Sequence, residues 1–136
     1  MNPIARWLKF NLVGALGMLV QLAALACFNR LAPGHYLAST IAAIELTLLH
    51  NFFWHLRYTW RDRGAGLSIL TQLLRFHLSN GLVSLAGNLV LMRLLVGEAH
   101  MPVLAANVIA ILCCSLLNFC LGDSWVFAQI NRIEAS

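Results

Sequence analysis

The chain has 136 residues and a formal net charge of +4; 60% of its residues are hydrophobic and only 10% are charged. Soluble domains usually carry about 25% charged residues, and one soluble domain of this length could not hide so much apolar surface from water. The composition therefore excludes an ordinary soluble domain and favours a protein that lies in lipid.

Four long apolar segments follow one another along the chain, separated by turn residues or charges. They run over about residues 8–28, 36–54, 78–96 and 102–121. Each is close to the roughly 20 residues that an α-helix needs to cross about 30 Å of hydrocarbon. The alternation of polar and apolar residues that is typical of membrane β-strands is absent from these segments. They predict an all-α integral membrane protein.

The first segment begins beside two cations, Arg6 and Lys9, and in this respect resembles a secretory signal peptide. Three further apolar segments follow it, so we expect it to stay in the protein as a span. The prediction is therefore four transmembrane helices arranged as two helical hairpins.

The Lys and Arg residues predict an orientation. Seven of the nine lie at segment ends that would face one side of the membrane: Arg6, Lys9, Arg57, Arg61, Arg63, Arg75 and Arg132. Arg30 and Arg93 lie at the opposite ends. Because cytoplasmic loops carry an excess of Lys and Arg, we predict that both termini and the central loop, about residues 55–71, are cytoplasmic. Contact with anionic membrane lipids would suit the same basic face.

Sliding the sequence against itself by 67 residues reveals an internal repeat. The offset pairs Asn51-Phe52 with Asn118-Phe119, Tyr58 with Trp125, and Trp60 with Phe127. We predict a single membrane domain, 1–136, built from repeat 1 (about 6–63) and repeat 2 (about 72–130). Each repeat crosses the membrane twice, so the two enter from the same side and are parallel repeats.

Small residues form a stripe on the first helix of each repeat. Gly14, Gly17 and Gln21 share one helix face, and the offset places Gly81, Ser84 and Asn88 on the equivalent face. Small residues at this spacing let helices approach closely. Two interpretations stay open: a seam where helices pack, or one wall of a substrate groove.

Glu45 is the only acidic residue well inside a predicted span. An ionised carboxylate there costs roughly 2.5–3.5 kcal/mol on insertion scales, so such residues usually face the protein interior or a water-filled cavity. In one interpretation Glu45 is functional and binds a coupling proton or a hydroxyl group of a sugar. The other makes it a structural residue, hydrogen-bonded to Gln21 or Asn88.

Motifs for catalysis are missing from the sequence. No glycine-rich phosphate loop, paired carboxylates or zinc-binding motif is present, and His50 and His55 are five residues apart, a poor spacing for chelation on one helix. The four cysteines match no metal-binding pattern. We predict no enzymatic activity, no cofactor, no metal and no nucleic-acid partner.

Several of these features together resemble the GtrA-like family. They are the opening Lys9-Phe10-Asn11-Leu12-Val13-Gly14, the paired segments 51–60 and 118–127, and the four-helix length. The resemblance implies a small bacterial inner-membrane protein of cell-surface polysaccharide synthesis. Such proteins are thought to flip a polyprenyl-phosphate-linked sugar, typically undecaprenyl-phosphate glucose, and to work beside a polyprenyl-phosphate glycosyltransferase.

The sequence departs from the family pattern just before each aromatic pair. The family commonly shows Asn-Arg there, whereas this chain has His55-Leu56 and Gly122-Asp123. Arg57 lies one place beyond the expected arginine in the first half, and the second half has none at that place. A phosphate-binding role therefore transfers only by displacement, to Arg57.

The first hypothesis is a flippase for a lipid-linked sugar, with a predicted substrate-binding set of nine residues. Three cations, Arg57, Arg61 and Arg75, would receive the lipid phosphate. Four polar side chains would line the sugar path: Gln21, Glu45, Asn88 and Asn107. Asn51 and Asn118 complete the set. The alternative is a non-transporting scaffold for a glycosyltransferase. A third is a small proton-coupled exporter. Two hairpins leave little room for a pathway, so we also expect a homo-oligomer.

Overall fold

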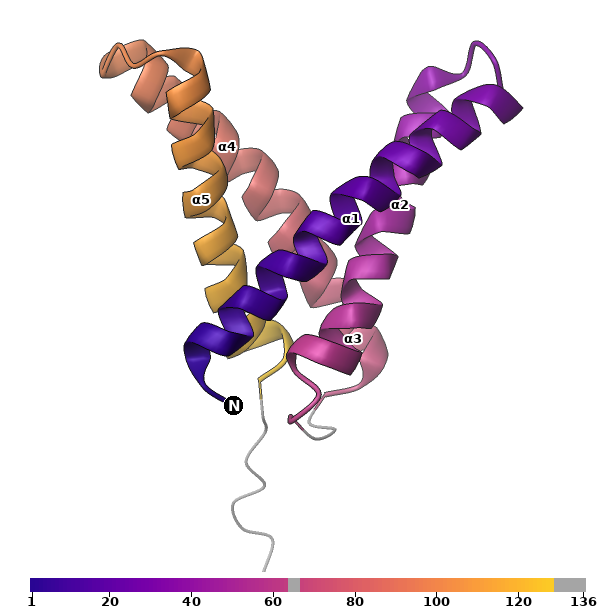
Figure 1. Cartoon of the computed structure of the whole chain (residues 1–136), viewed down its shortest axis with the longest axis vertical. Helices are drawn as coiled ribbons and strands as arrows, with labels where there is room; N and C mark the ends of the chain where they lie inside the picture. The colour runs from indigo at the N-terminus through magenta and orange to yellow at the C-terminus, as the bar shows by residue number, and fades with distance from the viewer. Residues whose placement is uncertain (64–66, 129–136) are drawn as a thin grey trace, which may run out of the picture. The chain divides into compact units, whose positions relative to one another are not determined.

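The computed structural model describes residues 1–63 and 67–128, and all regular structure in those ranges is helical (Figure 1). Arg132 and the end of the predicted second repeat, residues 129–130, lie outside the described residues. The chain divides into two compact units, Met1–Asp62 and Arg63–Ser136. We call them hairpin 1 and hairpin 2, and each is described by itself.

Hairpin 1 consists of two long helices and a short π-helical turn. Its elements are α1 (Pro3–Leu31), α2 (Tyr36–Trp54) and η1 (His55–Thr59), and η1 continues α2 directly. The side chain of Asn2 caps α1 by accepting a hydrogen bond from the Ile4 N–H at 2.9 Å, with Pro3 at the first helical position. Gly34, at φ +85°, allows the tight turn between α1 and α2.

Hairpin 2 begins with four helical elements in succession: α3 (Ile69–Phe76), η2 (His77–Val83), α4 (Ser84–Met92) and η3 (Arg93–Glu98). Together they form one candidate span of 30 residues. The hydroxyl of Ser68 caps α3 by accepting from the Thr71 N–H at 3.2 Å. After a turn, α5 (Val103–Leu121) returns along α4 and η2, and η4 (Gly122–Val126) packs against α3.

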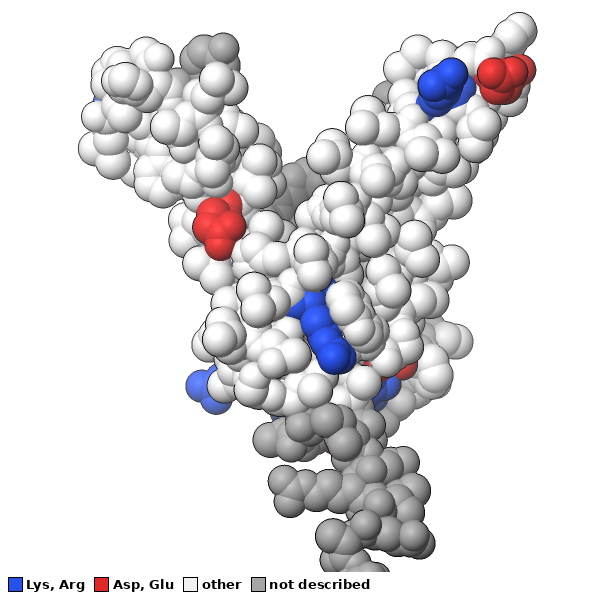
Figure 2. Space-filling model, turned by 180° about the vertical axis from the view of Figure 1, so that it is seen from behind, with Lys and Arg blue, Asp and Glu red and all other residues white. Residues whose placement is uncertain are grey.

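Four helices of the described chain are long and apolar enough to cross a membrane, which confirms the all-α prediction. Their outward side chains are mostly leucine, isoleucine and valine, and charged residues are sparse on the face in Figure 2. The predicted segment 36–54 coincides with α2. The third helix, predicted from residue 78, instead begins at Ile69. The first turns of this helix were missed because polar Gln72 and Arg75 interrupt the apolar run.

The central loop is correspondingly shorter than the predicted 55–71. Helical structure continues through Thr59 and resumes at Ile69. Thr59 and His55 are buried side chains of η1. The polar residues after α2 therefore belong to a buried helical turn. From hydropathy alone these residues were predicted to be part of the loop.

Small side chains lie where the two helices of each hairpin pack. In hairpin 1 the buried residues include Gly17 and Ala24 on α1 and Ala43 on α2; in hairpin 2 they include Ala106 and Ala110 on α5. Since lipid tails are as apolar as leucine, association of membrane helices depends on close van der Waals packing rather than on the hydrophobic effect. The alanine and glycine positions supply that closeness.

Candidate functional site

Three aromatic rings close the end of hairpin 1 where α1 begins and η1 ends. The ring of His55 stacks on Phe10 with centroids 4.9 Å apart and planes at 11°. Trp60 lies edge-on to both, at 5.2 Å from His55 and 6.0 Å from Phe10. His55 also hydrogen-bonds through Nδ1 to the hydroxyl of Thr59 at 3.0 Å. His55 is thus a buried packing residue, a role that the sequence did not predict.

Hairpin 2 closes in the same manner 67 residues later in the chain. The Trp60 N–H donates to the His55 carbonyl at 2.8 Å, and the Phe127 N–H donates to the Gly122 carbonyl at 2.9 Å. Phe127 packs against Phe76 with centroids 6.3 Å apart. Trp60 and Phe127, the second members of the aromatic pairs singled out by spacing, therefore each end a π-helical turn.

The two asparagines of the Asn-Phe pairs contact the small-residue stripes. A Cβ atom on Gly17 would lie 2.8 Å from Cγ of Asn51 and closer still to the amide oxygen. In hairpin 2, Nδ2 of Asn118 donates to Oγ of Ser84 at 2.7 Å. Gly17 and Ser84 thus belong to the packing contact within each hairpin, as in the seam interpretation.

The rest of the stripe lies away from that contact. A Cβ atom on Gly14 or Gly81 would meet no other described residue within 4 Å. Gln21 is half-buried, and so is Asn88, whose amide donates to the Ser84 carbonyl on its own helix at 2.9 Å. Gly14 and Gly81 therefore do not lie at the tight helix contact within their own hairpins.

Glu45 and Asn107 are exposed on the helices that carry them, α2 and α5. The predicted path residues are divided between the units: Gln21 and Glu45 belong to hairpin 1, Asn88 and Asn107 to hairpin 2. Neither hairpin by itself brings all four together.

The predicted phosphate ligands lie against aromatic rings or at the surface. The guanidinium of Arg57 lies 5.6 Å from the centre of the Phe53 ring, and Arg61 is exposed. The guanidinium of Arg75 lies 5.2 Å from the ring of Trp125 and donates to the Trp125 carbonyl at 2.8 Å. Arg57 and Arg61 belong to hairpin 1, whereas Arg75 tethers the end of η4 within hairpin 2.

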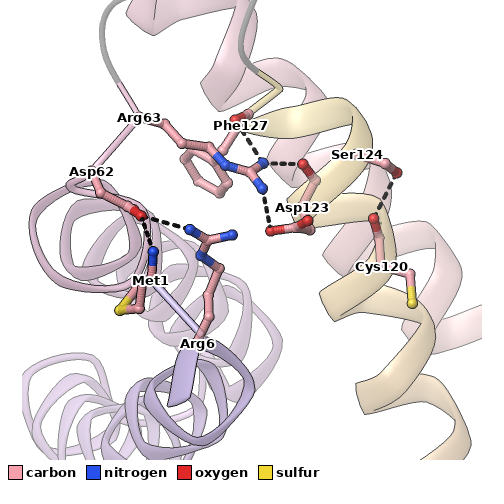
Figure 3. A network of polar contacts seen from close by, with 8 residues as sticks. All are labelled: Met1, Arg6, Asp62, Arg63, Cys120, Asp123, Ser124 and Phe127. Atoms are coloured by element: carbon pink, nitrogen blue, oxygen red, sulfur yellow. Dashed lines mark hydrogen bonds and ion pairs between the residues drawn. The ribbon is translucent and has the colours of Figure 1, made fainter. Parts of the chain in front are cut away.

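Each unit also contains an ion pair that sequence reasoning missed (Figure 3). In hairpin 1, Nη2 of Arg6 donates to Asp62 at 2.7 Å, and the ammonium of Met1 lies 3.3 Å from the same carboxylate oxygen. In hairpin 2, Nη2 of Arg63 donates to Asp123 at 2.6 Å. The other terminal nitrogen of Arg63 donates to the backbone carbonyls of Asp123 and Phe127. The partners are some sixty residues apart in sequence, so spacing gave no signal.

These contacts hold the Asp62 carboxyl in its charged form. Partial desolvation acts to raise its pKa, but hydrogen bonds from the terminal ammonium, its own backbone and Arg6, with the Arg6 charge, outweigh that effect. The net pKa of Asp62 lies below its usual value of 3.8.

The sequence was also compared with known proteins. Residues 9–130 match the model of the family described as GtrA/DPMS, transmembrane domain. The chain belongs to this family. It is a multi-pass membrane protein, in agreement with the four candidate spans, and the family resemblance inferred from the motifs is confirmed.

A relative of this GtrA/DPMS chain is a protein of Pyrococcus furiosus named dolichol-phosphate mannosyltransferase. The two are 40% identical over 78 residues, which are 57% of this chain and 22% of the relative. The chain thus spans less than a quarter of the length of the curated relative that it matches.

Knowledge of the family gives the Arg63–Asp123 pair a further meaning. Asp123 occupies the position at which GtrA-like proteins commonly carry an arginine, and here it binds Arg63 within hairpin 2. At this position the chain therefore carries an anion, which is paired with Arg63. Across the described ranges, no three His, Cys, Asp or Glu side chains gather as a metal site.

Proposed function

We propose that this chain flips a polyprenyl-phosphate-linked sugar, such as undecaprenyl-phosphate glucose, across the bacterial inner membrane for cell-surface polysaccharide synthesis. Membership of the GtrA/DPMS family supports a role in polyprenyl-phosphate sugar metabolism. The observation that carries translocation is the exposure of Glu45 and Asn107 on apolar spans. Polar side chains in the hydrocarbon region are costly and usually functional, and a mere anchor needs none on its outer faces.

In this proposal the sugar moves along side chains that can exchange hydrogen bonds with its hydroxyls. Glu45 and Asn107 offer exposed polar atoms, while half-buried Gln21 and Asn88 offer amides. The Oδ1 of Asn118 is buried and has no hydrogen-bond partner in the part of the chain that the structure describes. It would accept a hydrogen bond from a hydroxyl. Asn51 contributes by holding α2 against Gly17.

The lipid phosphate is received by arginines, because a guanidinium fork matches the geometry of phosphate oxygens. Arg57 and Arg61 expose their side chains on hairpin 1. Arg75 uses one terminal nitrogen for the Trp125 carbonyl and has further N–H donors for a phosphate. The polyprenyl tail stays in lipid throughout, so only the polar head has to be screened from hydrocarbon.

The chain itself performs no covalent chemistry in this account. In this proposal a polyprenyl-phosphate glycosyltransferase forms the sugar lipid at the cytoplasmic face, and the predicted orientation puts the basic residues on the same side. Two hairpins are small for a complete pathway, and we propose that copies of the chain associate to enclose it.

A second candidate function is a scaffold that anchors a glycosyltransferase without transporting anything. The Pyrococcus relative supports it, because there the matching segment is a minor part of a longer protein named as a mannosyltransferase. A scaffold needs its loops and its partner, whereas the exposed polar residues inside the spans would be dispensable.

Paired substitutions separate the two functions. Glu45→Gln should lower flipping of a short-chain polyprenyl-phosphate glucose in liposomes by about tenfold, the equivalent of one charge-assisted hydrogen bond lost from the barrier. Glu98→Gln is the matched control, since Glu98 is exposed at the far end of the third span. Arg57→Ala should also lower flipping, with Arg30→Ala as its control.

Equal flipping in Glu45→Gln, Arg57→Ala and their controls would remove these residues from the path. Co-purification with a glycosyltransferase that survives Glu45→Gln but is lost on replacement of Arg61 would instead favour the scaffold.

A further inference from the structure

Hairpin 1 carries an apolar groove outside the proposed sugar path. It lies between α1 and the end of α2 with η1, and it is lined by Leu12, Val13, Leu16, Trp54 and Tyr58. Its volume is about 200 Å³ and its accessible lining is entirely apolar. Pockets for whole small molecules measure roughly 300–1,000 Å³. The groove therefore suits part of a molecule, such as a short length of hydrocarbon chain.

Two cations are held by aromatic rings that form the groove wall or touch it. Nζ of Lys9 lies 4.5 Å from the centre of the Tyr58 ring. Arg57 lies over the ring of Phe53, which packs edge-on against Trp54 with centroids 5.6 Å apart. No acidic residue is among the five that line the groove. An apolar slot beside two cations is complementary to a lipid with an anionic head.

We propose that this groove holds the first isoprene units of a polyprenyl phosphate, with its phosphate at Lys9 and Arg57. The inference rests on the proposed function and adds the place at which the lipid is first held. A groove of this volume admits one chain, which favours a single-chain polyprenyl lipid over a glycerophospholipid with two. It also gives Lys9, which is not among the proposed phosphate ligands, a direct part in substrate binding.

The energetics assign different tasks to the groove and the cations. A lipid tail gains little by leaving other lipid tails, because both surroundings are apolar. The groove therefore fixes where the chain lies through van der Waals fit, and the cations supply the preference for phosphate. A test must accordingly report position as well as affinity.

The experiment is photolabelling of the full-length protein in lipid nanodiscs with farnesyl phosphate that carries a diazirine on its first isoprene unit. Peptide mapping should place the label on residues 12–16 and 54–58. Leu16→Trp fills the groove and should abolish labelling there. Leu19→Trp, at an exposed leucine of the same helix outside the groove, should leave it unchanged. Lys9→Gln should weaken binding of the probe about fivefold, the effect of one cation near a membrane surface.

The inference is overturned if the label falls mainly outside these segments or persists in Leu16→Trp. It is also overturned if a diazirine-bearing phosphatidylglycerol labels the groove equally well, which would make it a general lipid site. Flipping measured on the same variants separates the two proposals. Normal flipping by Leu16→Trp would show that lipid binding in the groove is not part of translocation, and the proposal that the chain is a translocase would be unaffected. If the farnesyl probe labels the groove of a protein that does not flip lipid, the lipid site is supported and the translocase function is contradicted.

Discussion

Hairpin 1 and hairpin 2 solve the same packing problem with different chemistry. In hairpin 1 the helices meet where Asn51 fills the space above Gly17; in hairpin 2 Asn118 donates to the hydroxyl of Ser84. One contact depends on the absence of a side chain and the other on a hydrogen bond. The comparison teaches that the small-residue positions are not interchangeable, although the offset of 67 residues aligns them.

The aromatic ends differ in the same way. Hairpin 1 inserts a buried imidazole between Phe10 and Trp60, whereas the corresponding position in hairpin 2 is Gly122 and Phe127 packs against Phe76. Hairpin 2 instead ties its end down with Arg63 and Arg75, which donate to backbone carbonyls of η4 and the residue after it. Both ends thus combine ring packing with charge-assisted hydrogen bonds, but hairpin 1 adds an imidazole ring and hairpin 2 adds arginine bonds to backbone carbonyls.

The largest predicted effect comes from removing the ring that closes hairpin 1. Trp60 is only 2% exposed, so Trp60→Ala should lower the free energy of unfolding by about 3–5 kcal/mol. Phe127→Ala should cost less, because the smaller ring leaves a smaller cavity. Unfolding by SDS in mixed micelles, followed by circular dichroism, measures both. Equal and small losses would contradict the burial of these rings.

The next effect separates two glycines on one helix. Gly17→Leu forces a side chain into the space of Asn51 and should destabilise the protein by about 2–3 kcal/mol. Gly14→Leu is the matched control, because a side chain there meets no described neighbour. Replacing glycine within a helix should be neutral or stabilise it by up to about 1 kcal/mol. The same SDS titration decides, and an inverted order would place the tight helix contact at Gly14 rather than at Gly17.

A smaller effect depends on pH. Since the folded-state pKa of Asp62 is lowered below 3.8, its ion pair contributes stability that is fully present above that value and is lost as pH falls through the folded pKa. The difference in stability between wild type and Asp62→Asn should therefore stay constant from about pH 7 to pH 5 and close below about pH 4. Unfolding measured across this range checks the prediction. If the difference in stability changed near neutral pH instead, a group other than Asp62 would be responsible for the pH dependence.

The smallest effect tests the hydrogen bond of hairpin 2. Ser84→Ala removes the acceptor of Asn118 and should cost about 0.6 kcal/mol, the average for such bonds between membrane helices. Gly17→Ser sharpens the comparison, because it offers Asn51 the hydroxyl that Asn118 already has. It should be tolerated better than Gly17→Leu. A loss in Gly17→Ser as large as in Gly17→Leu would show that hairpin 1 cannot adopt the packing of hairpin 2.

Hydropathy was sufficient to predict the four spans, and it located α2 to the residue. It failed at Ile69–Phe76, because a helix whose buried face holds Gln72 and Phe76 has no continuous apolar run. The spacing of Asn51, Asn118 and the aromatic pairs predicted that these residues matter but not what they contact. The pairs Arg6–Asp62 and Arg63–Asp123, and the groove beside Trp54, depend on how the helices pack and leave no trace in local sequence.

The most direct test of the central claim is translocation by the purified wild-type chain alone. Liposomes that contain the protein and a short-chain polyprenyl-phosphate glucose, with a reporter of leaflet exposure and no glycosyltransferase present, would measure it. The account predicts protein-dependent flipping well above that of empty liposomes. Absence of flipping by protein shown to be folded and inserted would contradict it and leave the scaffold as the function.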